Sequence, residues 1–413
     1  MSREYKDSGI EWIGKIPKEW KCTCFKRFHN DANVGESIDK NFCSDSEDDV
    51  LFYTAGLKPI HTTYKDFPKW KYTSNNDLLL ARNGTPYVYL PFPESIYSDH
   101  IIRVGIKENY IREYTRYCIQ QAISFVVVDT VSIATWSISL WDKQFLPIPS
   151  LSEQQKIANY LDKVCGEVDE MVALQETMIE ELKAYKQSVI TEAVTKGLNP
   201  NVPMHDSGID WIGEIPEHWE VRKIGRLFRL RDEKNYKQME EVQLLSLYTG
   251  IGVFPHGEQE ERGNKAVTVE GYKVVHKDDI VVNIILAWMG AIGVSDYDGV
   301  TSPAYDVYIP DFTKVVPHYF HYVFRTKGIA AECYKYGRGI MMMRWRTYSS
   351  EFKQISVPYP SIEEQQQIAS YLDTKCSDID SLIALKQAKI EELKEYKKSV
   401  IYEYVTGKKE VGG

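Results

Sequence analysis

The chain contains two sequence segments that each occur twice. Asp7-Ser-Gly-Ile-Glu-Trp-Ile-Gly-Lys-Ile-Pro-Lys-Glu-Trp20 returns as Asp206-Ser-Gly-Ile-Asp-Trp-Ile-Gly-Glu-Ile-Pro-Glu-His-Trp219. Pro147-Ile-Pro-Ser-Leu-Ser-Glu-Gln-Gln-Lys-Ile-Ala-Asn-Tyr-Leu-Asp162 returns as Pro358-Tyr-Pro-Ser-Ile-Glu-Glu-Gln-Gln-Gln-Ile-Ala-Ser-Tyr-Leu-Asp373. The first pair is 199 residues apart (206 − 7) and the second 211 (358 − 147). Since the halves share little between these segments, the pattern indicates a duplicated frame that carries two unlike inserts, about residues 21–146 and 221–357.

Composition places few limits on this architecture. A chain of 413 residues can form two to four domains, and its 43% hydrophobic and 26% charged residues are ordinary for a soluble globular protein. No apolar run reaches the roughly 20 residues of a membrane span, and the first residues lack a signal-peptide core, so we expect a cytoplasmic protein with no membrane contact. The net charge of −9 argues against a nucleic-acid-coating protein but allows a local basic groove.

A long helix is predicted after each copy of the second segment. Ser150 or Ser152 and Ser361 are plausible N-caps, because acidic residues follow in the first turn and favour the positive end of the helix dipole. Gly197 and Gly407 are suited to end the two helices. Helices of about 40 residues would be roughly 60 Å long at about 1.5 Å per residue.

Both helices carry an apolar seam whose spacing alternates between three and four residues, as in a coiled coil. The seams turn polar at matched positions, Gln175 with Lys386 and Lys186 with Lys397, which favours pairing of the helices in a fixed register. The alternative is that each helix packs elsewhere and exposes this face. The positions assigned to the helix interface are Leu161, Val168, Val172, Gln175, Ile179, Leu182, Val189, Leu372, Ile379, Ile383, Lys386, Ile390, Leu393 and Val400.

The inserts have the mixed pattern of α/β domains. Short β-rich runs punctuated by glycine and proline alternate with helical patches. Strands are predicted at residues 77–81, 125–128, 279–286 and 304–309, and helices near 113–121 and 317–335. We interpret the repeated Trp-rich segments as braces that join helix to insert, rather than as ligand sites.

Catalytic motifs are lacking in the sequence. It has no phosphate-binding Gly-x-x-x-x-Gly-Lys-(Ser/Thr) loop and no Asn/Asp-Pro-Pro-Tyr/Phe loop of an amino methyltransferase. The seven cysteines are scattered without zinc spacing, and His318 and His321 lie one helical turn apart with no third ligand in view. We therefore expect no metal site, no cofactor and no catalysis in this chain.

Three repeated features of the frame resemble the specificity subunit of type I restriction-modification systems. They are the braces, the helix entry Pro-x-Pro-Ser-x-x-Glu-Gln-Gln-x-Ile-Ala-x-Tyr-Leu-Asp, and the segments Glu-Glu-Leu-Lys-x-Tyr-Lys-x-Ser-Val-Ile at 180–190 and 391–401. The resemblance covers the whole frame, and it implies a non-catalytic subunit that binds a bipartite site on double-stranded DNA. It further implies that the central helices set the spacer and dock two methyltransferase subunits. The full complex would add endonuclease subunits, and S-adenosylmethionine would bind the methyltransferase partners.

The expected fold is α+β, with two mixed α/β target-recognition domains separated by an antiparallel two-helix coiled coil and related by an internal pseudo-twofold repeat. The order brace, insert, helix occurs twice and is cyclic. The predicted divisions are residues 1–150 (first recognition domain, brace 7–20), 151–197 (first central helix), 198–357 (second recognition domain, brace 206–219) and 358–413 (second helix and tail).

Loop residues that can read bases or bind phosphate are the candidate DNA contacts. Arginine and lysine suit guanine, asparagine and glutamine suit adenine, and lysines suit phosphates. The candidates are Arg82, Asn83, Thr85 and Tyr87 in the first insert, and Lys234, Asn235, Lys237, Arg338, Arg344, Arg346 and Tyr348 in the second.

Two other functions fit parts of the pattern. A coiled-coil adaptor with protein-binding inserts would suit the acidic balance, and would show no salt-dependent DNA binding. A nuclease or hydrolase in one insert is disfavoured by the missing motifs.

Overall fold

The computed structural model describes residues 3–127, 134–249, 251–257, 268–339 and 345–412. The chain divides into two compact units, of which unit 1 is Met1–Glu176 with Ala388–Gly413 and unit 2 is Thr177–Gln387. Both divisions fall inside long helices, α3 (Leu151–Lys196) and α7 (Ile362–Val405). Each unit therefore contains a globular part together with a stretch of each long helix.

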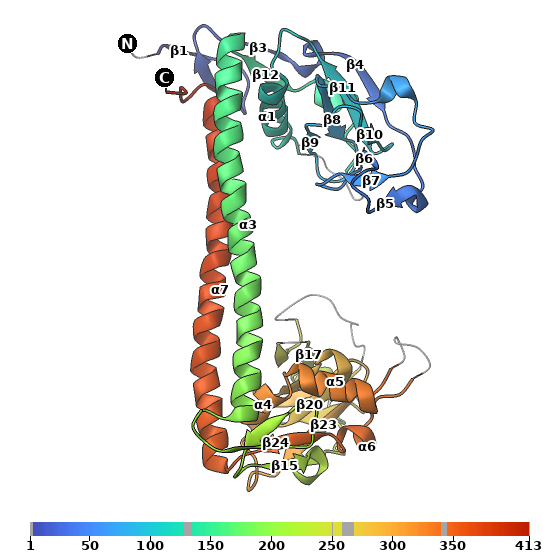
Figure 1. Cartoon of the computed structure of the whole chain (residues 1–413), viewed down its shortest axis with the longest axis vertical. Coiled ribbons are helices and arrows are strands. Elements are labelled where there is room, and N and C mark those ends of the chain that lie inside the picture. The colour runs from blue at the N-terminus through green and yellow to red at the C-terminus, as the bar shows by residue number, and fades with distance from the viewer. Residues whose placement is uncertain (1–2, 128–133, 250, 258–267, 340–344, 413) are drawn as a thin grey trace. The chain divides into compact units, whose positions relative to one another are not determined.

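Unit 1 is built around an antiparallel sheet in the order β4-β11-β8-β9, whose strand β8 is buried at every position. The helix α1 lies against this sheet (Figure 1). Tyr117 on α1 donates a hydrogen bond to Asp162 on α3 (2.7 Å). A second sheet has the order β10-β6-β7-β5, and two-stranded sheets pair β1 with β2 and β3 with β12. The elements are β1 (Tyr5–Asp7), β2 (Lys15–Pro17), β3 (Lys21–Cys24), η1 (Phe25–Arg27), β4 (His29–Val34), η2 (Lys40–Phe42), β5 (Cys43–Ser44), β6 (Val50–Tyr53), β7 (Ile60–Thr62), η3 (Lys69–Lys71), β8 (Asp77–Ala81), β9 (Val88–Tyr89), β10 (Ile96–Tyr97), β11 (Ile101–Ile106), α1 (Arg112–Ile123), α2 (Ile138–Asp142) and β12 (Phe145–Ile148).

Unit 2 repeats this plan with different details. Its main sheet has the order β16-β23-β20-β21, and the second sheet of unit 1 is replaced by two separate pairs, β17-β18 and β19-β22. The pairs β13-β14 and β15-β24 correspond to β1-β2 and β3-β12. The elements are β13 (Met204–Asp206), β14 (Glu214–Pro216), β15 (Glu220–Lys223), η4 (Ile224–Arg226), β16 (Phe228–Leu230), η5 (Met239–Glu241), β17 (Leu245–Tyr248), β18 (Gly252–Pro255), β19 (Lys273–Val275), β20 (Ile280–Asn283), η6 (Ala287–Met289), β21 (Ile292–Val294), β22 (Gly299–Thr301), β23 (Tyr305–Pro310), α4 (Pro317–Val323), α5 (Lys327–Tyr336), α6 (Ser349–Phe352) and β24 (Ser356–Tyr359).

Most of the predicted elements are confirmed, and three need correction. The strand expected at 279–286 ends at Asn283, because the Asn283 side chain accepts from the backbone N–H of Ile285 (3.0 Å) and so makes a turn. The helical patch 317–335 is two helices, and Thr326 caps the second. The run predicted as a strand at 125–128 forms none over residues 125–127, and Val128 lies outside the described residues. Residues 125–127 continue from α1 in a turn, and the Phe125 ring stacks on Trp12 at a centroid distance of 6.0 Å.

The braces fasten onto the first turns of the long helices. Trp20 donates its indole N–H to Glu153 (2.9 Å) in unit 1, and Trp219 donates to Glu364 (3.1 Å) in unit 2. His218 Nε2 lies 2.8 Å from the Glu364 carboxylate. Burial raises the pKa of the Glu364 carboxyl, but hydrogen bonds from His218 and Trp219 outweigh this effect, so the pKa lies below its usual value. The structural interpretation of the repeated segment is thus confirmed.

The same tryptophans close the far ends of the helices. Gly407, after α7, and Gly197, after α3, both adopt the left-handed conformation with φ of +69° and +73°. An added Cβ at Gly407 would lie 2.9 Å from the Trp20 ring, and one at Gly197 would lie 3.1 Å from Trp219. Each brace therefore joins the start of one long helix to the end of the other, and glycine is needed for both its conformation and its size.

In each unit, one buried glutamine at the start of a long helix binds the globular part to that helix. Gln154 accepts from the backbone N–H of Ile111 (2.9 Å), and Gln365 accepts from Val316 (2.8 Å). Both amides also donate to a carbonyl just before their own helix, at 3.0 Å. Two residues of the motif Glu-Gln-Gln are thus explained, since its glutamate holds the brace and its first glutamine holds the insert.

Within each unit the two long helices run in opposite directions. In unit 1, Tyr160 contacts Tyr404 (ring centroids 4.4 Å apart), and Asp169, further along α3, pairs with Lys397, earlier on α7 (2.6 Å). In unit 2, Lys186 pairs with Asp380 at 2.6 Å. Because Asp380 and Lys397 lie 211 residues beyond Asp169 and Lys186, the same ion pair occurs in both units.

The predicted seam faces inward. Its buried positions are Leu161, Val168, Ile179, Val189, Leu372, Ile379, Ile390, Leu393 and Val400, and its partly buried positions are Val172, Gln175, Leu182, Ile383 and Lys386. The polar position Lys186 finds an aspartate on the other helix, and Lys386 Nζ lies 3.1 Å from the Met178 sulfur.

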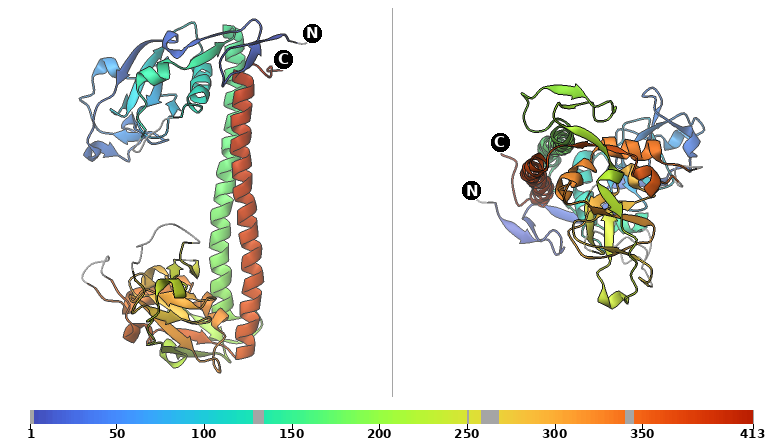
Figure 2. Two further views of the ribbon diagram at one scale, coloured as in Figure 1. Left: turned by 180° about the vertical axis from the view of Figure 1, so that it is seen from behind. Right: turned by 90° about the horizontal axis from the view of Figure 1, so that it is seen from below.

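The beginning and the end of the described chain lie side by side in unit 1 (Figures 1 and 2). The Tyr5 hydroxyl donates to the Gly407 carbonyl (3.1 Å), and Lys408 Nζ donates to the Ile13 carbonyl (2.7 Å). In unit 2 the chain itself connects the end of α3 to the second brace. In unit 1 the end of α7 is connected to the first brace by hydrogen bonds instead.

Candidate nucleic-acid interface

Three loops of unit 1 meet at one end of its main sheet. Strand β11 pairs with β8 so that Ile101 lies opposite Ala81, and with β4 so that Ile102 lies opposite Val34. The residues that follow β4 and β8 and those that precede β11 therefore emerge together. We call this edge the sheet end of unit 1.

The first group of predicted DNA contacts lies at this sheet end. Arg82 is exposed, and its guanidinium donates to the Asp99 carbonyl (3.2 Å). Asn83 is half-buried beside His100, with Oδ1 and Nδ1 3.1 Å apart. Thr85 is exposed, whereas Tyr87 packs edge-on against Tyr89 at 4.7 Å and is partly buried.

Trp136 holds this loop in place, which sequence reasoning missed. Its backbone N–H donates to the Arg82 carbonyl and its indole N–H to the Gly84 carbonyl, both at 2.7 Å. These bonds engage the backbone carbonyls of the loop, and the Arg82 side chain stays exposed to solvent. The loop is therefore supported from behind, as a recognition loop must be to keep its side chains oriented.

The corresponding sheet end of unit 2 collects the second group. Strand β23 places Tyr305 opposite Asn283, the last residue of β20. Residues 231–237 continue the direction of β16, and Arg231 donates its backbone N–H to the Val307 carbonyl (2.8 Å). Thr347 donates to the Ile284 carbonyl (2.9 Å), which brings the segment around 345–348 to the same edge.

A buried ion pair anchors the loop that follows β16. The carboxylate of Asp279, whose side chain is 2% exposed, accepts from Arg231 Nε and Nη2 at 2.8 and 2.9 Å. It also accepts from the backbone N–H of His276 at 2.8 Å. In unit 1 the corresponding Asp77 is buried too, but its arginine is Arg103, on β11. The position of the aspartate is common to both units, and the position of its arginine is not.

Of the three residues picked in this loop, Lys234 and Lys237 are exposed and Asn235 is not. The Asn235 amide donates to the carbonyls of Lys237 and Val269, both at 3.0 Å, and accepts from the Lys237 N–H. Asn235 therefore shapes the loop, and its assignment as a DNA contact is corrected. Both N–H donors of the Asn235 amide are used within the loop, and burial of the side chain keeps it from contact with a base.

The arginine group of unit 2 is partly described. The backbones of Arg338 and Arg346 pair with each other through two hydrogen bonds of 2.9 and 3.0 Å. The Arg338 side chain is 67% exposed, lies 5.2 Å from the Tyr348 ring centroid and pairs with Glu351 at 3.1 Å. Tyr348 is 40% exposed and Arg346 is partly buried. Arg344 lies outside the described residues.

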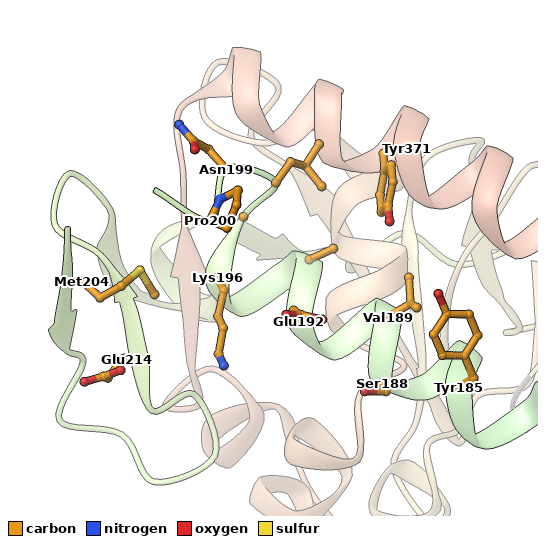
Figure 3. Close-up of a pocket in the computed structure, with 13 residues that line it drawn as sticks. Tyr185, Ser188, Val189, Glu192, Lys196, Asn199, Pro200, Met204, Glu214 and Tyr371 are labelled. Carbon is orange, nitrogen blue, oxygen red and sulfur yellow. The ribbon is translucent and has the colours of Figure 1, made fainter. Parts of the chain in front are cut away.

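A cavity of about 500 Å³ in unit 2 lies away from these loops in sequence (Figure 3). It is lined by the end of α3, by residues of the segment 197–204 and by Tyr371 of α7. Tyr185 and Tyr371 are 50% and 41% exposed there, beside the charged Glu192 and Lys196. The lining therefore combines aromatic surface with charged side chains.

Neither a metal centre nor a membrane span is found in the described part of the chain. No group of three or more His, Cys, Asp or Glu is placed to hold a metal among those residues. His318 is bonded to Asp373 (2.7 Å), and burial lowers the pKa of His321 to about 3, so the ring is held neutral. No helix in the same ranges is long and apolar enough to cross a bilayer.

Comparison with known proteins agrees with the duplicated frame. The family model described as type I restriction modification DNA specificity domain matches residues 17–184 and again 216–395. The putative type I restriction enzyme MjaX specificity subunit of Methanocaldococcus jannaschii is 28% identical, over 96% of this chain and 95% of that protein. The type I restriction enzyme EcoBI specificity subunit of Escherichia coli is 23% identical, over 79% of this chain and 72% of that protein.

A solved structure supports the fold. It comes from work on complex assembly and conformational transition of the type I R-M system, and it matches with a TM-score of 0.69. The match is 14% identical and covers 94% of this chain and 98% of that chain. The fold, the two family-model matches and the relatives that are named as specificity subunits agree. The chain belongs to the family of type I restriction-modification DNA specificity subunits and carries the DNA specificity domain twice.

Proposed function

We propose that each unit reads one half of a bipartite site on double-stranded DNA with the loops at its sheet end. The observation that carries this proposal is the contrast between frame and sheet ends. The brace, the buried glutamine and the Asp–Lys pair repeat residue by residue in both units, whereas the side chains at the sheet ends differ. A frame that repeats while its reading surface changes is what two unlike half-sites require.

Arg82 in unit 1 and Arg338 in unit 2 are the strongest candidates for base contacts. Both side chains reach solvent. Their loops are held by backbone hydrogen bonds, so the loss of backbone entropy on binding is limited. Arginine pairs with guanine through two hydrogen bonds in the major groove. Lys234 and Lys237, which are exposed, are proposed as phosphate contacts, which position the protein without reading sequence.

The proposed role of α3 and α7 is to hold the half-site readers at a set distance. In this proposal the helices form one antiparallel coiled coil with pseudo-twofold symmetry, and its register is fixed by the two Asp–Lys pairs. A polar pair in an apolar seam is a known means of fixing register.

The same helices are proposed to dock two methyltransferase subunits, with endonuclease subunits added in the full complex. Exposed apolar side chains occur at matched positions of both helices, 211 residues apart, which is the arrangement expected if two copies of one partner bind. The matched pairs are Met171 and Leu382 (45% and 48% exposed), Leu174 and Leu385 (53% and 67%), and Tyr185 and Tyr396 (50% and 51%). In this proposal the chain is non-catalytic, and S-adenosylmethionine binds the partners.

The DNA proposal is tested by exchange of one recognition region. A chain in which residues 221–357 are replaced by those of another specificity subunit should change one half of the methylated motif and keep the other. Modified-base sequencing of DNA from cells that carry the complete system measures both halves. A motif that changes in both halves, or in neither, contradicts the proposal.

The docking proposal is tested by the stoichiometry of the purified complex. Tyr185→Ser and Tyr396→Ser together should reduce methyltransferase binding more than either variant alone, because each tyrosine serves one copy. Phe145→Ser, at a side chain 45% exposed on β12, is the control. Equal stoichiometry in the double variant and the control by light scattering would contradict this assignment.

A further inference from the structure

Two large aromatic side chains stand exposed at corresponding places of the two units. Trp70, on the short helix η3, is 65% exposed, and Tyr236, in the loop after β16, is 80% exposed. Neither packs into the hydrophobic clusters of its unit. Single exposed aromatics are common on protein surfaces, so their meaning depends on their surroundings.

Lysines flank both rings in the sequence. Trp70 follows Lys69, and the ammonium of Lys71 lies 5.3 Å from its ring centroid. Tyr236 lies between Lys234 and Lys237. Lys69, Lys234 and Lys237 are exposed, and none of the three forms an ion pair with another residue in the described ranges. Unpaired lysines beside an exposed ring make a surface that favours an anionic partner with a flat or apolar component.

We call each exposed ring with its flanking lysines an aromatic tip. The two tips come from two segments that meet in each unit. One segment leads to the buried aspartate of the main sheet, and the other follows its first strand. In unit 1, Lys71 of the first segment donates to the Val34 carbonyl (3.0 Å) and pairs with Glu36 of the second. In unit 2, Asn235 of the second segment donates its backbone N–H to the carbonyl of Tyr272 of the first (2.7 Å). Trp70 lies seven residues before Asp77, and Tyr272 seven before Asp279, so these segments correspond.

The aromatic tip thus occurs at the same junction in both units but is supplied by opposite segments. Trp70 belongs to the segment before the aspartate, whereas Tyr236 belongs to the segment after the first strand. A residue inherited from the duplicated frame would sit on the same segment in both copies. Independent placement of a lysine-flanked ring at one junction indicates a shared requirement of the bound partner.

We propose that Trp70 and Tyr236 pack against the sugar–phosphate backbone of duplex DNA, with Lys69, Lys234 and Lys237 on phosphates. This inference rests on the proposed DNA-reading function and adds to it sequence-independent contacts beside each reading surface. Phosphate and sugar contacts fix register and supply affinity but do not discriminate bases. A deoxyribose offers the apolar face, and its phosphates the negative charge, that the two tips require.

The test uses the assembled methyltransferase complex with two duplexes of equal length, one with the methylated motif and one without it. Trp70→Ala and Tyr236→Ala should each weaken binding to both duplexes by about fivefold or more, the loss expected when an apolar ring face is no longer buried against deoxyribose. Lys69→Ala should lower the slope of log affinity against log salt by about one, since one phosphate contact is lost. The methylated motif should stay unchanged in all three variants.

The control substitutions remove two other exposed rings, Phe145 (45% exposed) and Phe312 (60% exposed), which lie outside the proposed contact. Phe145→Ala on β12 in unit 1 and Phe312→Ala after β23 in unit 2 should leave both affinities unchanged. Thermal unfolding of each variant establishes that a loss of binding does not come from unfolding.

Three results would overturn the inference. One is unchanged DNA affinity in both ring variants, and another is an equal loss in the controls. The third is weakened assembly with the methyltransferase at full DNA affinity, which would assign the tips to a protein partner. If the unmodified complex does not prefer the duplex with the motif, the proposed function itself fails, and this failure is separate because it appears before any substitution.

Discussion

Substitution of Asp279 by alanine should destabilise unit 2 more than any surface change. The carboxylate is 2% exposed and accepts three hydrogen bonds, two of them from the Arg231 guanidinium. Removing one partner of a buried ion pair costs about 3–5 kcal/mol, because the other charge stays buried and unpaired. Arg231 is 14% exposed and keeps Glu233 at 3.2 Å, so we expect the lower end, about 3 kcal/mol.

Calorimetry of the purified chain would measure this cost, with the two units followed as separate transitions. At roughly 2–4 °C per kcal/mol for a unit of this size, the unit 2 transition should fall by about 6–12 °C. Asp77→Ala should cost less in unit 1, because Arg103 keeps a closer second carboxylate, Asp31 at 2.7 Å.

A double substitution separates the ion pair from general packing. Arg231→Met with Asp279→Leu should be milder than Asp279→Ala alone, because no unpaired charge remains. The reasoning would be refuted if Asp279→Ala shifted the transition by less than about 2 °C, the shift expected for under 1 kcal/mol, or if the double variant were the less stable of the two.

Three further substitutions probe the frame. Gly407→Ala should cost about 1 kcal/mol for its left-handed conformation and more for contact with Trp20, so it should exceed Gly197→Ala in denaturant unfolding; equal costs would contradict the packing argument. Because the folded-state pKa of Glu364 lies below its usual value, the stabilisation by this carboxylate is present above about pH 4.5 and is lost as the pH falls through the lowered pKa. Glu364→Gln should therefore weaken the loss of unit 2 stability at acid pH. An unchanged loss at acid pH would contradict this prediction. Gln365→Leu should cost about 1–3 kcal/mol, since it leaves a buried backbone N–H of the recognition domain without an acceptor; a change below 0.5 kcal/mol by the same measurement would show that another group replaces it.

The frame was predictable from sequence because its signals are local and occur twice. Ser150 and Ser361 cap the long helices, with their hydroxyls 3.2 Å from the backbone N–H groups of Glu153 and Glu364. The stops at the glycines and the seam of each helix follow from patterns within a few turns of chain. The correspondence of the two halves is itself a sequence observation, and the motifs that repeat in it carry the resemblance to the family.

The candidate site was less predictable, because exposure depends on neighbours that are distant in the chain. Lys234 and Asn235 are adjacent and equally polar, yet one reaches solvent and the other is enclosed by its own loop and by Val269. Trp70 and Tyr236 carry no motif that separates them from core aromatics, so sequence reasoning missed both.

By itself, the sequence determined that this protein is a repeated frame with two capped helices, two braces and two unlike inserts, since each of these depends on short-range pattern. Tertiary structure decided which aspartate each seam lysine pairs with, which arginine reaches each buried aspartate and which side chains stand free at the sheet ends. Those outcomes depend on strand register and on the antiparallel order of the helices within each unit, and such register is set by the summed packing of segments that lie far apart in sequence.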